Sequence, residues 1–147
     1  MINRILMVCV GNICRSPMAE YRLRSELADS EYTIESAGLG ALVGRPIDPS
    51  AGEIMSSAGI DVSSHRARQL TPELLRSFDI ALVMESGHEK ALLEMAPLAR
   101  GRVFQLGKWE NDRPIVDPYR RSKEFFEHTY KIIEQDVVRW ADFLARQ

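Results

Sequence analysis

Short apolar runs alternate along the chain with segments whose apolar residues recur every three or four positions. The runs predict four β-strands, over Arg4–Cys9, Tyr32–Ser36, Asp79–Met84 and Arg102–Leu106. Three of these strands are almost continuously apolar, which is typical of a parallel sheet that is covered on both faces.

The segments between the runs carry helix signals. Ser16 is a favourable N-cap and Pro17 suits the first helical position, so we expect a helix that reaches about Leu27. Further helices are expected from Asp48-Pro49 to near Gly59, from Thr71-Pro72 over a short stretch, over Ser86–Met95, and after Ser122, where apolar residues recur as far as Leu144. Alternating strands and helices predict a single α/β domain over residues 1–147.

One segment shows neither the strand pattern nor the helix pattern of apolar residues. Gly107 to Arg121 contains two prolines and several acidic residues, and a loop of this length in a compact domain is usually functional or disordered.

Composition narrows the class of protein. The 147 residues are 45% hydrophobic and 27% charged, which is typical of a globular protein, and the net charge of −2 argues against nucleic acid as a partner. No apolar run approaches the roughly 18 residues that a membrane span requires, and the N-terminus does not read as a signal peptide. We therefore expect a cytoplasmic protein that is not inserted in the membrane, whose two cysteines are reduced.

Both cysteines lie in the turn that joins the first predicted strand to the first predicted helix, in the segment Cys9-Val10-Gly11-Asn12-Ile13-Cys14-Arg15-Ser16-Pro17. The start of a helix favours an anion, and the same field stabilises a thiolate. Arg15 adds a planar fork that can hold two phosphate oxygens. The combination indicates a thiolate at Cys9 that attacks phosphorus and forms a phosphocysteine.

Such a reaction needs an acid to protonate the leaving oxygen. Asp117 is the best candidate, because Pro118 stiffens the irregular segment around it.

Other interpretations of these residues are open. A cysteine after a strand is commonly a packing residue, and an aspartate before a proline is commonly a turn former. A metal site is disfavoured because Cys9 and Cys14 lack zinc-motif spacing and His65, His88 and His128 are scattered, so neither a metal nor another cofactor is expected.

On these motifs the chain resembles the low-molecular-weight protein tyrosine phosphatases over essentially its whole length. The loop fits the C-x5-R-S pattern near the N-terminus, and Asp117-Pro118-Tyr119 fits the late acid motif. Three further segments occur in the expected order: Glu35-Ser36-Ala37-Gly38, Gly44-Arg45-Pro46 and His65-Arg66-Ala67-Arg68-Gln69.

The resemblance implies a four-stranded parallel sheet with helices on both faces and a phosphate-binding loop between the first strand and the first helix. It implies that Cys9 is the nucleophile, Arg15 the phosphate clamp and Asp117 the acid that later activates water. The implied substrate-binding residues are Val10, Gly11, Asn12, Ile13, Cys14, Ser16, Leu39 and Tyr119.

Supporting roles follow from the same resemblance. Ser16 would donate a hydrogen bond to the Cys9 thiolate, and Asn12 would take a left-handed conformation held by Ser36 and His65. A capping or core role for His65 is also open. Cys14 would form a protective disulfide with Cys9 under oxidant, although a small residue filling space under the loop is the alternative.

The rim of the pocket indicates a branch of the family. Leu39 and Leu42 are aliphatic where eukaryotic members carry an aromatic, and Tyr119 would provide one aromatic wall. The segment through Arg120 and Arg121 is similar to bacterial members that dephosphorylate the cytoplasmic tails of membrane tyrosine kinases in exopolysaccharide or capsule production. The two arginines either recruit such a tail or form a solvated turn.

Two alternative functions share this loop. An arsenate reductase of the same fold would need further cysteines for its disulfide relay, and the chain has only two. A phosphopeptide-binding inactive relative would not need Asp117. The oligomeric state cannot be inferred from the sequence.

Overall fold

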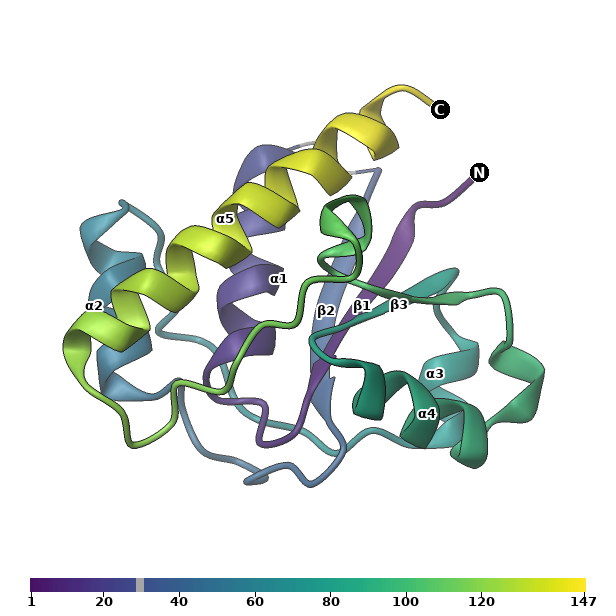
Figure 1. Cartoon of the computed structure of the whole chain (residues 1–147), viewed down its shortest axis with the longest axis horizontal. Helices are drawn as coiled ribbons and strands as arrows, with labels where there is room; N and C mark the ends of the chain where they lie inside the picture. Colours follow the sequence, from purple (N-terminus) through teal and green to yellow (C-terminus); the bar gives the residue numbers. More distant parts are fainter. Residues whose placement is uncertain (29–30) are drawn as a thin grey trace.

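The computed structural model describes residues 1–28 and 31–147. Four parallel strands form one sheet in the order β2-β1-β3-β4 (Figure 1): β1 (Arg4–Cys9), β2 (Thr33–Gly38), β3 (Ile80–Val83) and β4 (Val103–Gln105). The predicted four-stranded parallel sheet is confirmed. The second strand extends two residues beyond Ser36, because Cys9 of β1 pairs with Gly38.

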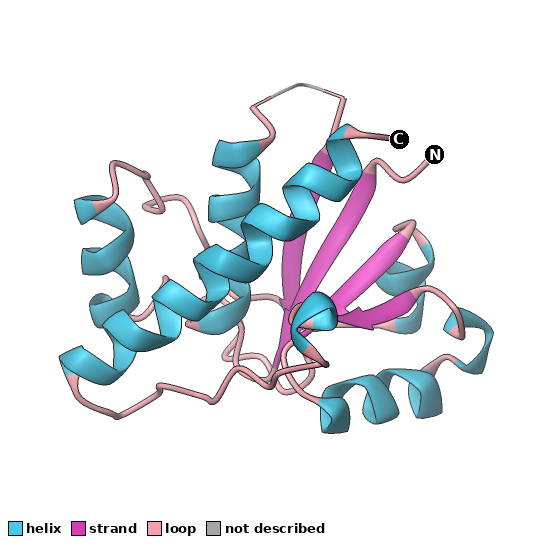
Figure 2. Cartoon of the chain, turned by 45° about the horizontal axis from the view of Figure 1, so that its top comes forward, coloured by secondary structure: helices cyan, strands magenta, loops and turns pink. Residues whose placement is uncertain are grey.

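Within the described residues, five α-helices surround the sheet: α1 (Arg15–Glu26), α2 (Pro49–Ser57), α3 (Pro72–Arg76), α4 (Ser86–Met95) and α5 (Lys123–Ala145). Successive side chains of β1 point to opposite faces, as the pleat requires. Ile5 and Met7 join a core with α1, α2 and α5, whereas Leu6 and Val8 join a second core with α3 and α4. The predicted covering of both faces is therefore confirmed (Figure 2).

Three of the predicted helix starts have the expected caps. The side chains of Asp48, Thr71 and Ser122 accept hydrogen bonds from backbone N–H groups in the first turns of α2, α3 and α5. The predicted cap at Ser16 is wrong: α1 begins at Arg15, and its N-cap residue is Cys14, which makes no side-chain cap bond. The Ser16 hydroxyl instead lies against the Cys9 sulfur.

The segment from Gly107 to Arg121 is irregular, as predicted, except for one 3-10 turn at Lys108–Glu110. It is nevertheless held at the end of β3, because Ile115 N–H donates to the Met84 carbonyl at 2.9 Å. A side chain on Gly107 would lie 2.4 Å from the Arg113 carbonyl oxygen, so the start of the segment folds back closely on itself.

The connections leaving β1 and β3 diverge. These strands are neighbours, but the chain passes from β1 through α1 to β2 on one side and from β3 through α4 to β4 on the other. Such a switch point opens a crevice at the carboxyl ends of the strands, where parallel α/β folds bind ligands. None of the helices in the described ranges is both long and apolar enough to cross a bilayer.

Candidate active site

The loop between β1 and α1 is held in place by hydrogen bonds that its carbonyl groups accept from the surrounding segments. Every carbonyl from residue 9 to residue 13 accepts a hydrogen bond, at 2.7 to 3.1 Å, from Leu39 N, Gly40 N, Leu42 N, His65 Nε2 and Asp48 N in turn. Within the described part of the chain, no group accepts from the N–H groups of residues 11 to 14. The loop therefore offers a set of free N–H donors at a helix N-terminus, which is suited to an anion.

Cys9 is nearly buried at the floor of this loop, and its sulfur lies 2.8 Å from the Ser16 hydroxyl oxygen. The Asn12 amide nitrogen is 2.8 Å from the same hydroxyl oxygen and 2.9 Å from that of Ser36. Because an amide nitrogen only donates, the Ser16 oxygen accepts there and its own hydrogen is available to the sulfur. The arrangement stabilises a thiolate at Cys9.

Asn12 has the left-handed conformation that the family resemblance implies, with φ of 59°. Its side-chain oxygen accepts from Arg68 N at 2.9 Å, and its carbonyl accepts from His65 Nε2 at 2.7 Å. Ser36, the second acceptor of its amide, donates onward to the buried Glu20 carboxylate. The contacts expected of Ser36 and His65 are both present, so the strained residue is held from three directions.

Arg15 is almost fully buried beside the loop, with its side chain 2% exposed. Its Nη1 donates to Glu85 Oε2 at 2.6 Å and to the Ile115 carbonyl at 2.8 Å, and its Nη2 lies 3.7 Å from Asp117 Oδ2. Because Nη1 is occupied on two sides, the Nε–Nη2 edge is left to meet an anion in the loop.

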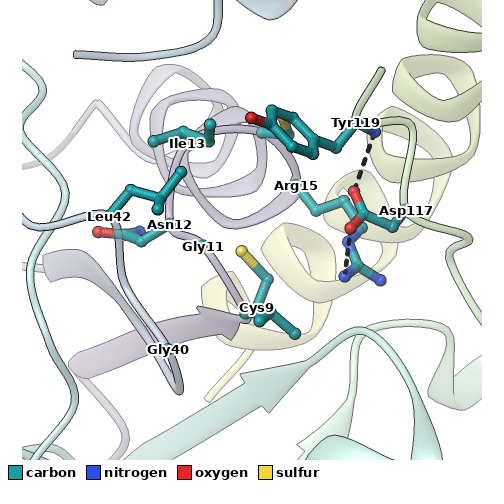
Figure 3. A pocket seen from close by; sticks show the side chains of 11 residues that line it. Cys9, Gly11, Asn12, Ile13, Arg15, Gly40, Leu42, Asp117 and Tyr119 are labelled. Atoms are coloured by element: carbon teal, nitrogen blue, oxygen red, sulfur yellow. Dashed lines mark hydrogen bonds and ion pairs between the residues drawn. The ribbon is translucent and has the colours of Figure 1, made fainter. Parts of the chain in front are cut away.

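Asp117 stands across the pocket mouth from Cys9, on the irregular segment (Figure 3). Its side chain is 48% exposed, and its Oδ1 accepts from Tyr119 N at 3.0 Å, which orients the carboxyl group. Asp117 is 102 residues beyond Arg15 in the sequence, and the fold brings the two side chains together.

The pocket encloses about 190 Å³, less than the roughly 300–1,000 Å³ of sites for drug-sized ligands, so it suits one phosphorylated side chain. Its lining residues are Cys9, Val10, Gly11, Asn12, Ile13, Cys14, Arg15, Gly40, Leu42, Asp117 and Tyr119. The placement of Leu39 in the substrate site is not borne out by this lining. Leu39 packs against the second core, and Leu42 lines the rim of the pocket instead.

Comparison with known proteins decides the family. Residues 4–147 match the family described as low molecular weight phosphotyrosine protein phosphatase. The chain belongs to this family. It is 46% identical over 144 residues to the low molecular weight protein-tyrosine-phosphatase Wzb of Salmonella typhimurium, covering 98% of this chain and 95% of that protein.

Solved structures with high TM-scores are also similar to this chain. Vibrio vulnificus Wzb in complex with benzylphosphonate has a TM-score of 0.92 at 43% identity, covering 97% of this chain and 99% of that one. The YwlE arginine phosphatase of Geobacillus stearothermophilus also has a TM-score of 0.92, at 32% identity, covering 98% and 94%. The fold is thus shared by relatives with different named substrates.

Three polar residues near the loop were missed by the sequence interpretation: Glu20, Glu85 and His88. Glu85 is the first charged residue after β3, at the same sheet edge as Cys9, and this position in the sequence could have revealed it. Glu20 lies one turn after Ser16 on α1, and burial raises the pKa of its carboxyl group while Ser36 and Arg24 oppose that rise. Nothing in the sequence pattern distinguishes Glu20 from an exposed helix residue.

Cys14 is buried under the loop as a free thiol. Burial raises the pKa of this thiol well above its usual range, and the nearby Asp48 and Cys9 raise it further. In the described ranges, no three His, Cys, Asp or Glu side chains gather as metal ligands would.

Proposed function

We propose that this phosphatase hydrolyses phosphotyrosine in proteins through a phosphocysteine at Cys9. The observation that carries the proposal is the loop itself: a nearly buried thiol beneath free N–H groups, beside an arginine with one open edge. A phosphoryl group bound there has its three equatorial oxygens facing the N–H groups and Arg15, which stabilise charge in the transition state.

The chemistry runs in two steps. In the first, the Cys9 sulfur forms a bond to phosphorus as the bond from phosphorus to the tyrosine oxygen breaks, and Asp117 gives its proton to that oxygen. In the second, Asp117 takes a proton from water, the water oxygen bonds to phosphorus, and the sulfur leaves as a thiolate that accepts the Ser16 hydrogen bond. The products are tyrosine and inorganic phosphate.

Phosphotyrosine is favoured as the substrate by the walls of the pocket. Ile13 and Leu42 are apolar, and Tyr119 is aromatic and exposed at the mouth. An aryl ring gains from contact with such apolar and aromatic walls, whereas the polar N–H groups of a phosphorylated guanidinium gain nothing from them. Phosphoarginine is the second substrate class to test, because the structurally similar YwlE is named an arginine phosphatase.

The substrate experiment uses one peptide with phosphotyrosine, phosphoserine or phosphoarginine at the same position. We expect kcat/KM for the phosphotyrosine form to exceed the other two by about 100-fold or more, because only its ring fills the apolar mouth. A phosphoarginine form hydrolysed as fast as the phosphotyrosine form would reject the substrate assignment while leaving the cysteine chemistry intact.

The physiological substrate that we propose is the autophosphorylated cytoplasmic tail of a bacterial tyrosine kinase in exopolysaccharide or capsule production. Support comes from Arg120 and Arg121, which follow the pocket residue Tyr119. Both are exposed, and the Arg120 guanidinium stacks 5.1 Å from the Tyr119 ring centroid. A tail with several phosphates is attracted by cations at this position, and salt weakens the attraction.

Charge reversal tests this recruitment. In the Arg120→Glu/Arg121→Glu variant, KM for a multiply phosphorylated tail peptide should rise by about tenfold at low salt, whereas kcat/KM for a small aryl phosphate should change less than about twofold. The matched control is Arg76→Glu/Arg100→Glu, which makes the same charge change at exposed positions that precede β3 and β4, on the opposite edge of the sheet. Equal losses on both substrates would end the recruitment proposal.

A further inference from the structure

His88 lies against the carboxylate that holds Arg15. Glu85 Oε2, which accepts from Arg15 Nη1 at 2.6 Å, is also 3.5 Å from His88 Nε2. The two residues are one helical turn apart at the start of α4, where His88 N–H donates to the Glu85 carbonyl at 3.0 Å. The backbone of this turn therefore keeps the imidazole next to the Glu85 side chain.

The burial of these two residues is unequal. The His88 side chain is 9% exposed, and its Nδ1 has no hydrogen-bond partner in the described part of the chain, whereas the Glu85 side chain is 41% exposed. A buried polar atom without a partner is costly, so an apolar residue would serve packing better at this position. An exposed carboxylate, for its part, rotates freely into water unless a neighbour restrains it.

We propose that His88 is a positioning residue that holds the Glu85 carboxylate against Arg15 and so keeps the guanidinium edge aimed at the phosphoryl group. The inference rests on the proposed function, because Arg15 must bind phosphate for its orientation to matter. Glu85 and the Ile115 carbonyl are the two acceptors at Nη1. If Glu85 turns away, the guanidinium pivots about the remaining contact and its open edge leaves the loop.

The charges around His88 keep it neutral near neutral pH. Burial lowers the pKa of the imidazole and Arg15 on α1 lowers it further, while Glu85 and Asp117 oppose them. The cavity beside His88 is lined by Gln105 of β4 and Asp112 of the irregular segment as well.

A neutral imidazole with its proton on Nε2, which lies 3.5 Å from Glu85 Oε2, leaves Nδ1 unprotonated, and this agrees with the lack of an acceptor at Nδ1 in the described part of the chain. When the pH falls and the ring becomes a cation, it competes with Arg15 for the same carboxylate oxygen. At acidic pH, His88 therefore holds the Glu85 carboxylate against Arg15 less firmly.

The experiment measures kcat/KM for an aryl phosphate from about pH 5 to about pH 8, the range in which histidine titrates, with wild type, His88→Leu and His88→Gln. At neutral pH, His88→Leu should lower kcat/KM about tenfold, because it removes the polar ring nitrogen that lies 3.5 Å from the Glu85 carboxylate. His88→Gln should retain at least about half of the wild-type value, since an amide nitrogen donates from a similar place but does not titrate. The ratio of wild type to His88→Gln should fall about threefold from neutral pH to about pH 5.

Two controls separate positioning from packing. His128→Gln, on the exposed side of α5, should give a flat ratio to wild type across the same pH range. Glu85→Gln combined with His88→Leu should be no slower than Glu85→Gln alone, because His88 acts through Glu85. Circular dichroism melts establish that each variant is folded, and if His88→Leu does not fold, the pH ratio for His88→Gln decides by itself.

Several results overturn the inference. They are a wild-type rate for His88→Leu, an equal loss for His88→Leu and His88→Gln, a ratio that does not change with pH, or additive losses in the double variant. In each of these outcomes the wild type is still an active phosphatase, and only the proposed role of His88 is rejected. A wild type without aryl phosphatase activity would instead remove the proposed function and this inference with it.

Discussion

The Ser16 hydroxyl lies 2.8 Å from the Cys9 sulfur and directs its hydrogen at it, because Asn12 Nδ2 already donates to the Ser16 oxygen from 2.8 Å. One asparagine side chain therefore both shapes the loop and orients the donor to the nucleophile. The chain of contacts continues through Ser36 to Glu20, so the thiolate site is supported by a buried network that begins on α1 and returns to it.

Replacing Ser16 by alanine removes the hydroxyl group through which this network contacts the Cys9 sulfur. A hydrogen bond to a charged group contributes about 2 kcal/mol, so kcat for Ser16→Ala should fall about 30-fold. Both the attacking and the leaving thiolate lose stabilisation, and the phosphocysteine should persist longer in a quenched-flow measurement. Ser56→Ala, at an exposed position in α2, is the matched control, and equal activity of the two variants would contradict the role of Ser16.

Gly38 is needed because the loop passes directly over it. A side chain there would lie 2.3 Å from the Val10 carbonyl oxygen and 3.1 Å from Asn12 Cβ. Gly38→Ala must push the loop outward, and we expect kcat/KM for an aryl phosphate to fall about tenfold or more, with a lower melting temperature.

The matched control for Gly38 lies in α4. Gly87→Ala meets no atom within 4 Å, so it should melt at the same or a slightly higher temperature and keep wild-type kinetics. Wild-type kinetics in Gly38→Ala as well would show that the loop tolerates displacement.

Cys14 should protect Cys9 from irreversible oxidation. Burial keeps the Cys14 pKa high, so peroxide oxidises this residue slowly and it stays reduced while Cys9 becomes a sulfenic acid. The Cys14 sulfur then bonds to the Cys9 sulfur as the sulfenic oxygen leaves in water, which gives a disulfide. After brief peroxide treatment, the wild type should regain most activity with dithiothreitol, whereas Cys14→Ser should not. Identical recovery of the two proteins would assign Cys14 to packing.

Asp136 makes stability depend on pH. It is buried on α5 and pairs with Arg113 at 2.7 Å, but burial raises the pKa of its carboxyl group to about 6 despite that partner. Since the folded pKa exceeds the unfolded value of 3.8, the folded state binds more protons between these pH values. This contribution to stability is complete below about pH 4 and is lost as the pH rises through about 6.

Denaturant unfolding measures this loss. Relative to Asp136→Asn, the wild type should lose about 1–2 kcal/mol of unfolding free energy between about pH 4 and about pH 6. Asp142→Asn, at an exposed position on the same helix, should show no such difference from wild type. A constant difference between wild type and Asp136→Asn would mean that Asp136 does not titrate in this range.

The strands and most helices could be predicted because their signals are local. Continuous apolar runs lie in strands covered on both faces, and Asp48, Thr71 and Ser122 cap helices within three residues of themselves. Ser16 has the same local signal, but its hydroxyl is taken by a sulfur seven residues earlier in the loop. The tertiary contact with Cys9 therefore prevents Ser16 from capping α1.

The site could be predicted only in part for a similar reason. Cys9, Arg15 and Asp117 belong to motifs that stand out in the sequence, and the fold brings them into one pocket. Leu39 and Leu42 are both aliphatic rim candidates, and only the packing of the folded chain shows that Leu42 lines the pocket and Leu39 contacts the second core. The position of Glu85 directly after β3 is a signal in the sequence, whereas the role of His88 depends on the contact of Glu85 with Arg15, which only the folded chain shows.

The most direct test is single-turnover hydrolysis of an aryl phosphate with acid quench, using wild type, Cys9→Ser and Asp117→Asn. The account predicts a trapped phosphoenzyme in the wild type, none in Cys9→Ser, and a slowed leaving step in Asp117→Asn. A wild type that binds a phosphotyrosine peptide but neither turns it over nor forms a phosphoenzyme would contradict the account, and the loop would then be a receptor for phosphate.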